Sequence, residues 1–283
     1  MTGTRDRQNL LDGPHDAATT TLTFTYEPDF GPGDILAIDL ELMYVWTVPD
    51  GSNTATVLRG YRGSTVVTHA NGALVTVSPV ISDFAIFRAL NAELASLSSS
   101  VNGLFAVDTV SVTWNSAVVG YDLTGVTDLI DVLAVYWDEV GPEKVWPEVH
   151  HWELRRNMDT GDFASGLQIL IPEGQPGNDI RVVYKKPFTP LTSTSNDMQA
   201  DVGLPATAND IPPLGVAYRL ISSEEIQRNF SNSQGDTRRA AEVPAGAQLK
   251  SAQGMAALWK RRVDEEAARL STAYPYKKRG LGY

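Results

Sequence analysis

ILAIDLELMYVWTV, the stretch from Ile35 to Val48, decides the fold class of this chain. It is rich in β-branched and aromatic residues, which favour strands. Asp50-Gly51, a dipeptide typical of tight hairpin turns, follows it, and Thr54 to Leu58 then supplies a returning strand. The stretch therefore predicts antiparallel β-structure built from hairpins.

Residues 19–80 are predicted to form a small β module around this hairpin. Thr19 to Tyr26 alternates like a strand, and Asn71-Gly72 turns the chain into Ala73 to Val77. The polar residues 1–18 lack the apolar core of a secretory signal and are expected to be a flexible leader. In residues 81–103 the spacing of apolar residues changes from that of a strand to that of a helix. Apolar side chains recur at Ile86, Leu90, Leu94 and Leu97, which predicts a helix.

Residues 104–188 predict a second β module. Turn signals at regular spacing favour an antiparallel sandwich or jelly-roll-like arrangement over a parallel sheet. The tryptophans of this module are expected in its core, at positions Trp114, Trp137, Trp146 and Trp152. The candidate strands are Val107 to Trp114, Val132 to Asp138, Val149 to Leu154, Leu167 to Ile171 and Ile180 to Tyr184.

The rest of the chain predicts a linker and a helical arm. Residues 189–212 are polar and proline-containing, which is typical of a linker or extended segment. Residues 213–283 predict a C-terminal helical arm with a basic tail, and its last helix covers about Leu249 to Ala273. The predicted fold is therefore α+β and mainly β, with antiparallel modules, one intervening helix and a C-terminal helical arm.

Charge is divided unevenly along the chain. The formal net charge is −11. From Lys250 to Tyr283 eight lysines and arginines stand against three acids, so this part carries +5 and the remainder −16. An acidic body does not favour broad neutralisation of nucleic-acid phosphates. Cysteine is absent, which excludes disulfides and thiolate chemistry, and no apolar run is long enough for a membrane span.

Two clusters are candidates for chemistry, and neither predicts an active site. His150-His151 lies between Glu148 and Glu153, but alternation along a strand would place these ligands on opposite faces. Carboxylates near Trp137 could resemble a glycosidase pair, and they are Asp128, Asp131, Asp138 and Glu139. Nucleophile elbows, phosphate loops and dinucleotide fingerprints do not occur in the sequence. We therefore expect no enzyme activity, no cofactor and no metal site.

The hairpin after residue 57 resembles one that recurs in virion proteins of tailed bacteriophages. Its residues are Val57-Leu58-Arg59-Gly60-Tyr61-Arg62-Gly63-Ser64, followed by His69-Ala70-Asn71-Gly72-Ala73-Leu74-Val75. The resemblance implies structural roles in closing a loop over the hairpin for Arg59, Gly60, Gly63, His69 and Gly72.

The C-terminal pattern resembles the closing helix of phage head-to-tail connector proteins. It reads Arg262-x-x-Glu265-Glu266-Ala267-x-Arg269-Leu270-x-x-x-Tyr274-Pro275. The resemblance implies a virion protein, assembled in the host cytoplasm, that forms a dodecameric ring against the portal protein and a tail-side neck or tail protein. Genomic DNA would pass through the ring without sequence-specific binding, and no membrane would be involved. The implied docking residues are Trp259, Arg261, Arg262, Arg269, Tyr274, Tyr276, Lys277, Lys278, Arg279 and Tyr283.

Two alternatives remain open at the level of sequence. The smaller connector proteins are mostly helical, and the large β modules of this chain also suit a structural or adhesion protein of the tail, baseplate or fibre. The second alternative is a virion-associated glycan hydrolase, which would require that the carboxylates around Trp137 converge in space.

Overall fold

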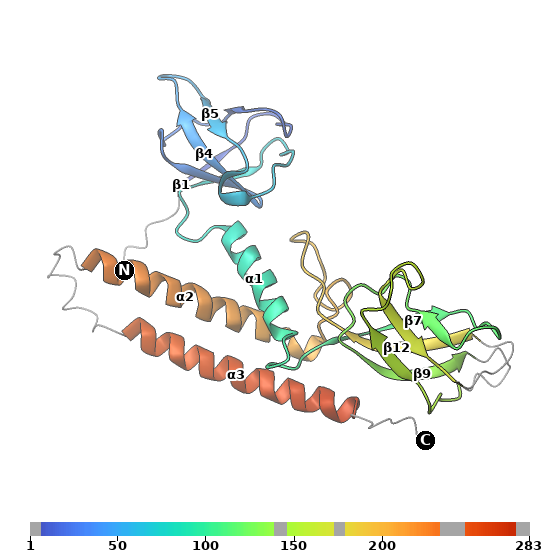
Figure 1. Cartoon of the computed structure of the whole chain (residues 1–283). Coiled ribbons are helices and arrows are strands. Elements are labelled where there is room, and N and C mark those ends of the chain that lie inside the picture. The colour runs from blue at the N-terminus through green and yellow to red at the C-terminus, as the bar shows by residue number, and fades with distance from the viewer. Residues whose placement is uncertain (1–6, 139–145, 173–178, 233–246, 276–283) are drawn as a thin grey trace. The chain divides into compact units, whose positions relative to one another are not determined.

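The computed structural model describes residues 7–138, 146–172, 179–232 and 247–275 (Figure 1). The chain divides into two compact units, Met1–Asn91 and Ala92–Tyr283, and the boundary falls inside a helix. Within the described residues, the N-terminal unit is built on one antiparallel sheet, and the C-terminal unit combines two antiparallel sheets with two long α-helices. The prediction of an α+β, mainly β fold with a C-terminal helical arm is confirmed.

The N-terminal unit contains one six-stranded antiparallel sheet in the order β1-β6-β3-β4-β5-β2. A short 3-10 turn, η1 (Tyr61–Gly63), lies between β5 and β6. The strands are β1 (Arg7–Leu10), β2 (Thr21–Thr23), β3 (Ile35–Ile38), β4 (Glu41–Thr47), β5 (Thr54–Leu58) and β6 (Leu74–Val77).

The two outer strands of this sheet meet, so the sheet closes on itself. A bridge joins Leu11 to Phe24. The Asp12 N–H donates to the Thr23 carbonyl at 2.9 Å, and the Thr25 N–H donates to the Leu10 carbonyl at 2.9 Å. Closure pairs edges that would otherwise be exposed for aggregation. The enclosed core consists of Leu11, Leu22, Phe24, Phe30, Leu36, Ile38, Met43, Val45, Ala55, Val57, Val75 and Val77.

Two parts of the N-terminal unit differ from the sequence prediction. The leader expected over residues 1–18 is not free along its whole length, because β1 pairs with β6 and His15 pairs with His69. The β region predicted from Ile35 to Val48 contains a turn that the sequence prediction did not place, at Asp39 with φ 52°. Short polar residues tolerate this left-handed conformation better than most, which is why no glycine marks the turn.

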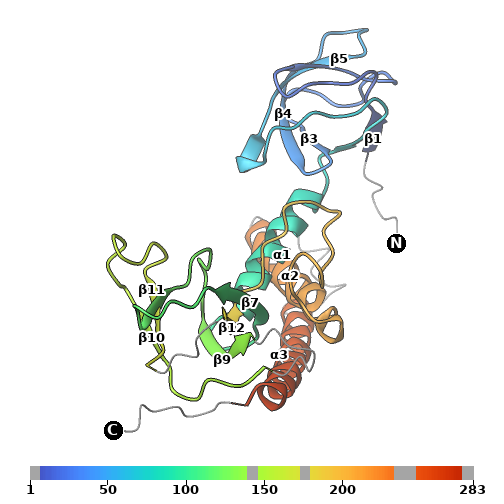
Figure 2. The ribbon, with the colours of Figure 1, turned by 90° about the vertical axis from the view of Figure 1, so that its right-hand side faces the viewer.

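The C-terminal unit contains two three-stranded antiparallel sheets, β10-β11-β8 and β7-β12-β9 (Figure 2). Residues from both sheets share one core, as in the predicted sandwich. Trp137 is buried in it, and Trp114 and Trp152 pack against it. The strands are β7 (Ala106–Val112), β8 (Gly120–Asp122), β9 (Asp131–Asp138), β10 (Glu153–Arg156), β11 (Leu167–Leu170) and β12 (Asp179–Lys186).

The sequence prediction of this module misses one strand and misplaces another. β8 is too short to show alternation, and β10 begins at Glu153 rather than at Val149. Trp146 is not in the core: it is 39% exposed, and the Arg181 guanidinium carbon lies 3.6 Å from its ring centroid. The turns predicted at Gly141-Pro142 and Pro176-Gly177-Asn178 lie outside the described residues.

Three helices complete the chain. α1 (Asp83–Leu97) follows the closed sheet, and α2 (Ile211–Asn232) and α3 (Ala247–Ala273) lie side by side (Figure 1). The short turn η2 (Ala206–Ala208) precedes α2. Residues 189–212 were expected to be extended, but they fold back on themselves: the Thr189 N–H donates to the Val202 carbonyl at 3.0 Å, and Val202 and Leu204 are buried.

An ion pair joins the buried carboxylate of Glu93, near the end of α1, to the partly exposed Arg219 of α2. Glu93 is only 1% exposed, and Arg219 Nε donates to its Oε2 at 2.8 Å. Gly215, one turn before Arg219, leaves room for this carboxylate, because a Cβ at position 215 would overlap it. Separating Glu93 from Arg219 would leave the buried carboxylate without a counter-charge. The contact therefore depends on the small size of Gly215.

We predict that Gly215→Ala destabilises the chain by about 1–3 kcal/mol, because the methyl group forces Glu93 away from Arg219. Urea unfolding at neutral pH measures the change. Gly254→Ala in α3 is the matched control: nothing lies within 4 Å of its Cβ position. That control should stabilise the chain by about 0.5–1 kcal/mol through helix propensity. Equal effects of the two substitutions would contradict the role of Gly215.

Candidate interaction surface on a buried charge centre

The N-terminal unit has a carboxylate at the end of its core. Along β4, alternation places Glu41 on the same side as Met43 and Val45, facing the inside of the closed sheet. Its side chain is fully buried. A buried carboxylate is costly without charged partners and hydrogen bonds, so its surroundings must supply both.

Glu41 receives five hydrogen bonds from the loop between β5 and β6. Arg59 donates through Nε to Oε1 at 2.7 Å and through Nη2 to Oε2 at 2.8 Å. The Gly60 N–H donates to Oε1 at 3.0 Å, and the Val67 N–H donates to Oε2 at 3.1 Å. His69 Nε2 lies 3.0 Å from Oε2. We call Glu41, Arg59 and His69 the buried charge centre.

A second layer of bonds ties three segments to the buried charge centre. Arg59 Nη1 donates to the carbonyls of Asp16 and Thr19, each at 2.9 Å. His69 Nδ1 lies 2.8 Å from the Asp39 carboxylate at the β3–β4 turn. The backbones of His69 and His15 pair in both directions. The centre therefore fixes the β5–β6 loop, the β3–β4 turn and the segment before β2.

Protonation equilibria at the centre are shifted in opposite directions. Burial by itself would raise the pKa of Glu41, but bonds from Arg59, His69 and two backbone N–H groups outweigh burial and lower this pKa from 4.5 to about 2. Burial would lower the pKa of His69, but its bonds to Glu41 and Asp39 raise it above 6.5. Both shifts favour the charged forms.

The residues predicted to be structural in the hairpin all lie at the centre or in its loop. Arg59 and His69 bind Glu41 directly. Gly60 has φ 65°, and a Cβ there would lie 3.0 Å from Val66 Cγ2. Gly63 and Gly72 have φ 80° and 76°, a conformation in which other residues are strained.

A row of aromatic residues, exposed at its two ends, runs along the outer side of the sheet and into this loop. We define the row as Trp46, Tyr44, Tyr61 and Arg62. The ring centroids are 6.4 Å apart from Trp46 to Tyr44 and 5.5 Å apart from Tyr44 to Tyr61. The Arg62 guanidinium carbon lies 5.5 Å from the Tyr61 centroid.

Trp46 lies on the outer face of β4, because it alternates with the inward-facing Val45, and it also lies at a bulge. The pairing of β4 with β5 shifts between Val45 and Thr47, so Trp46 is an extra residue at a bulge, and it is 66% exposed. Bulges re-aim side chains and are common next to functional surfaces. Leu58, which pairs with Tyr44 across the strands, is 57% exposed and extends the apolar surface.

Several residues predicted to dock on a partner also make contacts within the chain. Arg262 Nε donates to Asp210 at 2.7 Å, and its Nη1 donates to Glu265 at 2.7 Å. Arg269 Nε donates to Glu266 at 2.9 Å. Trp259 is only partly exposed. The Asp210 contact ties α3 to the residue before α2, whereas the contacts with Glu265 and Glu266 lie within α3.

The other predicted docking residues differ in exposure, and some lie outside the described residues. Arg261 is well exposed, with Glu265 at 3.7 Å. Tyr274 is 37% exposed and packs edge-on to Phe105, with a centroid distance of 6.1 Å. The remaining five, all in the basic tail, lie outside the described residues: Tyr276, Lys277, Lys278, Arg279 and Tyr283.

The clusters considered for chemistry are not assembled into a site. His150 and His151 are both exposed and precede β10 instead of lying in it. Asp138 pairs with Arg181 at 3.3 Å, and Glu139 lies outside the described residues. Within the part of the chain that the structure describes, no group of three or more His, Cys, Asp or Glu side chains is placed to hold a metal ion.

Sequence reasoning missed the carboxylate at the centre of this surface. A usable signal was present: Glu41 occupies an inward position in an alternating strand, where a charge requires a buried partner. It also missed the row, because the contact of Tyr44 with Tyr61 joins β4 to the β5–β6 loop and no local pattern shows it.

No protein-family model matches the sequence, and no curated protein matches it. Among the described residues, no helix has both the length and the apolar character needed to cross a membrane.

We predict that Glu41→Gln lowers the free energy of unfolding by about 3–5 kcal/mol, because Arg59 is left buried without a counter-charge. Urea unfolding at neutral pH measures this loss. Asp50→Asn, which removes an exposed carboxylate at the β4–β5 turn, should change stability by less than about 0.5 kcal/mol. Similar values for both variants would rule out the centre as a main source of stability.

We also predict a stability maximum in acid to near-neutral solution. Glu41 has a lowered pKa, so its contribution is complete above pH 4.5 and disappears as the pH falls towards about 2. His69 has a raised pKa, so its contribution is complete below pH 6.5 and disappears as the pH rises through its folded pKa. Urea unfolding as a function of pH measures both limbs. In His69→Gln the alkaline limb should become flatter, and an unchanged limb would contradict the assignment.

Proposed function

We propose that this protein is a structural component of a tailed-phage virion that assembles into a ring at the head–tail junction. In this proposal the C-terminal arm docks on the portal protein, a tail-side protein binds the other end, and DNA passes through the ring. The proposal rests on the resemblance of the hairpin and of the C-terminal helix to tailed-phage virion proteins. The contacts that these residues make in the structure support it.

The observation that carries the proposal is the aromatic row beside the buried charge centre. The motif residues Arg59, Gly60 and His69 are all occupied in holding a loop, which is a structural task. The row presents an exposed tryptophan, an exposed arginine and two partly buried tyrosines, the residue types most enriched where protein interfaces derive their affinity. A fixed loop limits the ordering cost of binding, so the arrangement favours an interface between subunits.

The helical arm supports the proposal in a second way. On α3, Val263 and Leu270 are buried, whereas Arg261, Asp264 and Glu265 remain exposed with both signs of charge interspersed. Exposed charge of this kind steers the choice and orientation of a partner more than it adds affinity. The acidic body suits a channel wall that does not bind passing DNA.

Electron microscopy of negatively stained protein, alone and mixed with portal protein, tests the proposal. Closed rings of uniform symmetry that bind the portal are the expected result. Dispersed monomers that ignore the portal would contradict it. Binding of a cell-surface glycan without ring formation would favour the tail or fibre alternative.

We predict that Trp46→Ala weakens self-association by about 2 kcal/mol, roughly 30-fold, because it removes the most exposed ring of the row. Sedimentation velocity over a concentration series measures the effect. Folding stability should change by less than about 0.5 kcal/mol, since the side chain is largely exposed. Tyr26→Ala is the matched control, an aromatic residue that is 62% exposed but outside the row. Equal weakening by both would argue against the row as the interface.

A further inference from the structure

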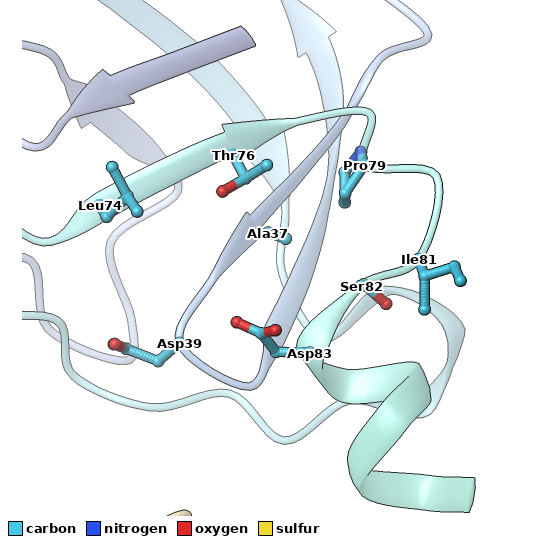
Figure 3. Close-up of a pocket in the computed structure, with 8 residues that line it drawn as sticks. All are labelled: Ala37, Asp39, Leu74, Thr76, Pro79, Ile81, Ser82 and Asp83. Atoms are coloured by element: carbon cyan, nitrogen blue, oxygen red, sulfur yellow. The ribbon is translucent and has the colours of Figure 1, made fainter. Parts of the chain in front are cut away.

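A groove lies on the outer side of the N-terminal unit, between β6 and the start of α1. Its volume is about 290 Å³. Figure 3 shows Ala37 at its centre, with Leu74, Thr76 and Pro79 above and the carboxylates of Asp39 and Asp83 below in that view. Ile81 and Ser82 complete the lining. The lining thus combines two carboxylates and two hydroxyls with four apolar side chains, and it contains no cation.

The groove is partly preformed. Asp39 is held at the β3–β4 turn by its bond to His69. Leu74 and Ile81 are 50% and 39% exposed, so two apolar side chains lie open beside the acids. A groove of this chemistry suits a long side chain with an aliphatic stem and a cationic head, which is the structure of lysine and arginine.

The sequence supplies a complementary segment. Residues 276–283 read Tyr-Lys-Lys-Arg-Gly-Leu-Gly-Tyr, with three cations, three apolar or aromatic residues and no acid. The N-terminal unit, residues 1–91, has five lysines and arginines against ten acids and so carries −5. Opposite net charges steer encounter and suppress wrong partners.

The length of the segment is sufficient to reach a neighbour. Eight residues at full extension span at most about 26–29 Å, close to the diameter of a small domain. In a ring of identical subunits each copy meets its neighbour through two different surfaces, so a groove on one surface and a tail on the other can be matched between neighbours.

We infer that the groove of Asp39 and Asp83 receives the basic C-terminal segment, residues 276–283, of a second copy of this chain. The inference rests on the proposed self-assembly and deepens it, because it assigns the end of the tail to the neighbouring subunit rather than to the portal.

The absence of cysteine allows a direct test by disulfide formation. Full-length Ile81→Cys and Leu281→Cys proteins, of distinguishable mass, are mixed and oxidised. The mixed disulfide should form on the order of tenfold faster than in the matched mixture of Asp50→Cys with Leu281→Cys, since Asp50 is exposed but outside the groove. Equal rates in the two mixtures would overturn the inference. So would exclusively intrachain disulfide in a chain that carries both Ile81→Cys and Leu281→Cys.

Charge reversal provides an independent readout. Asp83→Lys should weaken self-association on the order of tenfold, and so should the combined Lys277→Glu, Lys278→Glu and Arg279→Glu change. All four changes together should restore much of the loss, because the charges are exchanged between groove and tail. Asp50→Lys is the control and should have little effect. Asp39 is left unchanged, since it also binds His69. Failure of the exchanged charges to restore association would count against the groove.

The two proposals fail differently. Rings that form normally without residues 276–283 would overturn the groove assignment and leave the proposed function intact. Absence of rings in the full-length protein would overturn the proposed function itself.

Discussion

The N-terminal unit depends on one buried carboxylate. Glu41 lies at the end of a closed sheet, where burying its charged carboxylate without partners would cost too much free energy. Its five hydrogen bonds come from the β5–β6 loop, and that loop has no regular ladder of its own beyond η1. The carboxylate therefore takes the place of a strand partner for a segment that has none. The bonds that compensate the Glu41 carboxylate, together with those of Arg59 and His69, fix three parts of the unit. These are the loop itself, the β3–β4 turn and residues 15–19.

The same interaction explains how the motif is related to the surface beside it. Arg59 and His69 are the chemically versatile residues of the hairpin, yet both are fully engaged inside it. A partner of this unit is therefore expected to contact residues that the centre positions, rather than Arg59 or His69. Tyr61 and Arg62 directly follow Gly60, whose N–H binds Glu41, so the end of the aromatic row is coupled to the buried charge.

Much of the fold was predictable from sequence because its signals are local. Alternation and the Asp50-Gly51 turn located β4 and β5, and helical spacing located α1 and α3. The errors occurred where long-range contacts decide. β1 is polar and becomes a strand only because β6 lies beside it, and residues 189–212 fold back through their own side-chain and backbone bonds. The glutamate that organises the motif is eighteen residues before Arg59, and nothing local connects them.

The predicted docking residues show a general limit of the same kind. A stripe of cations on an amphipathic helix indicates that partners exist, but it does not say whether they belong to the same chain. Arg262 and Arg269 find Asp210 and Glu266 within this chain, and a paired charge contributes little to an outside partner until that pair is broken. Recognition by this protein is therefore expected from groups left without an internal counter-charge. The Asp83 carboxylate meets that criterion, because no side-chain hydrogen bond or ion pair joins it to another described residue. The aromatic row meets the corresponding apolar criterion, because Trp46 is left exposed.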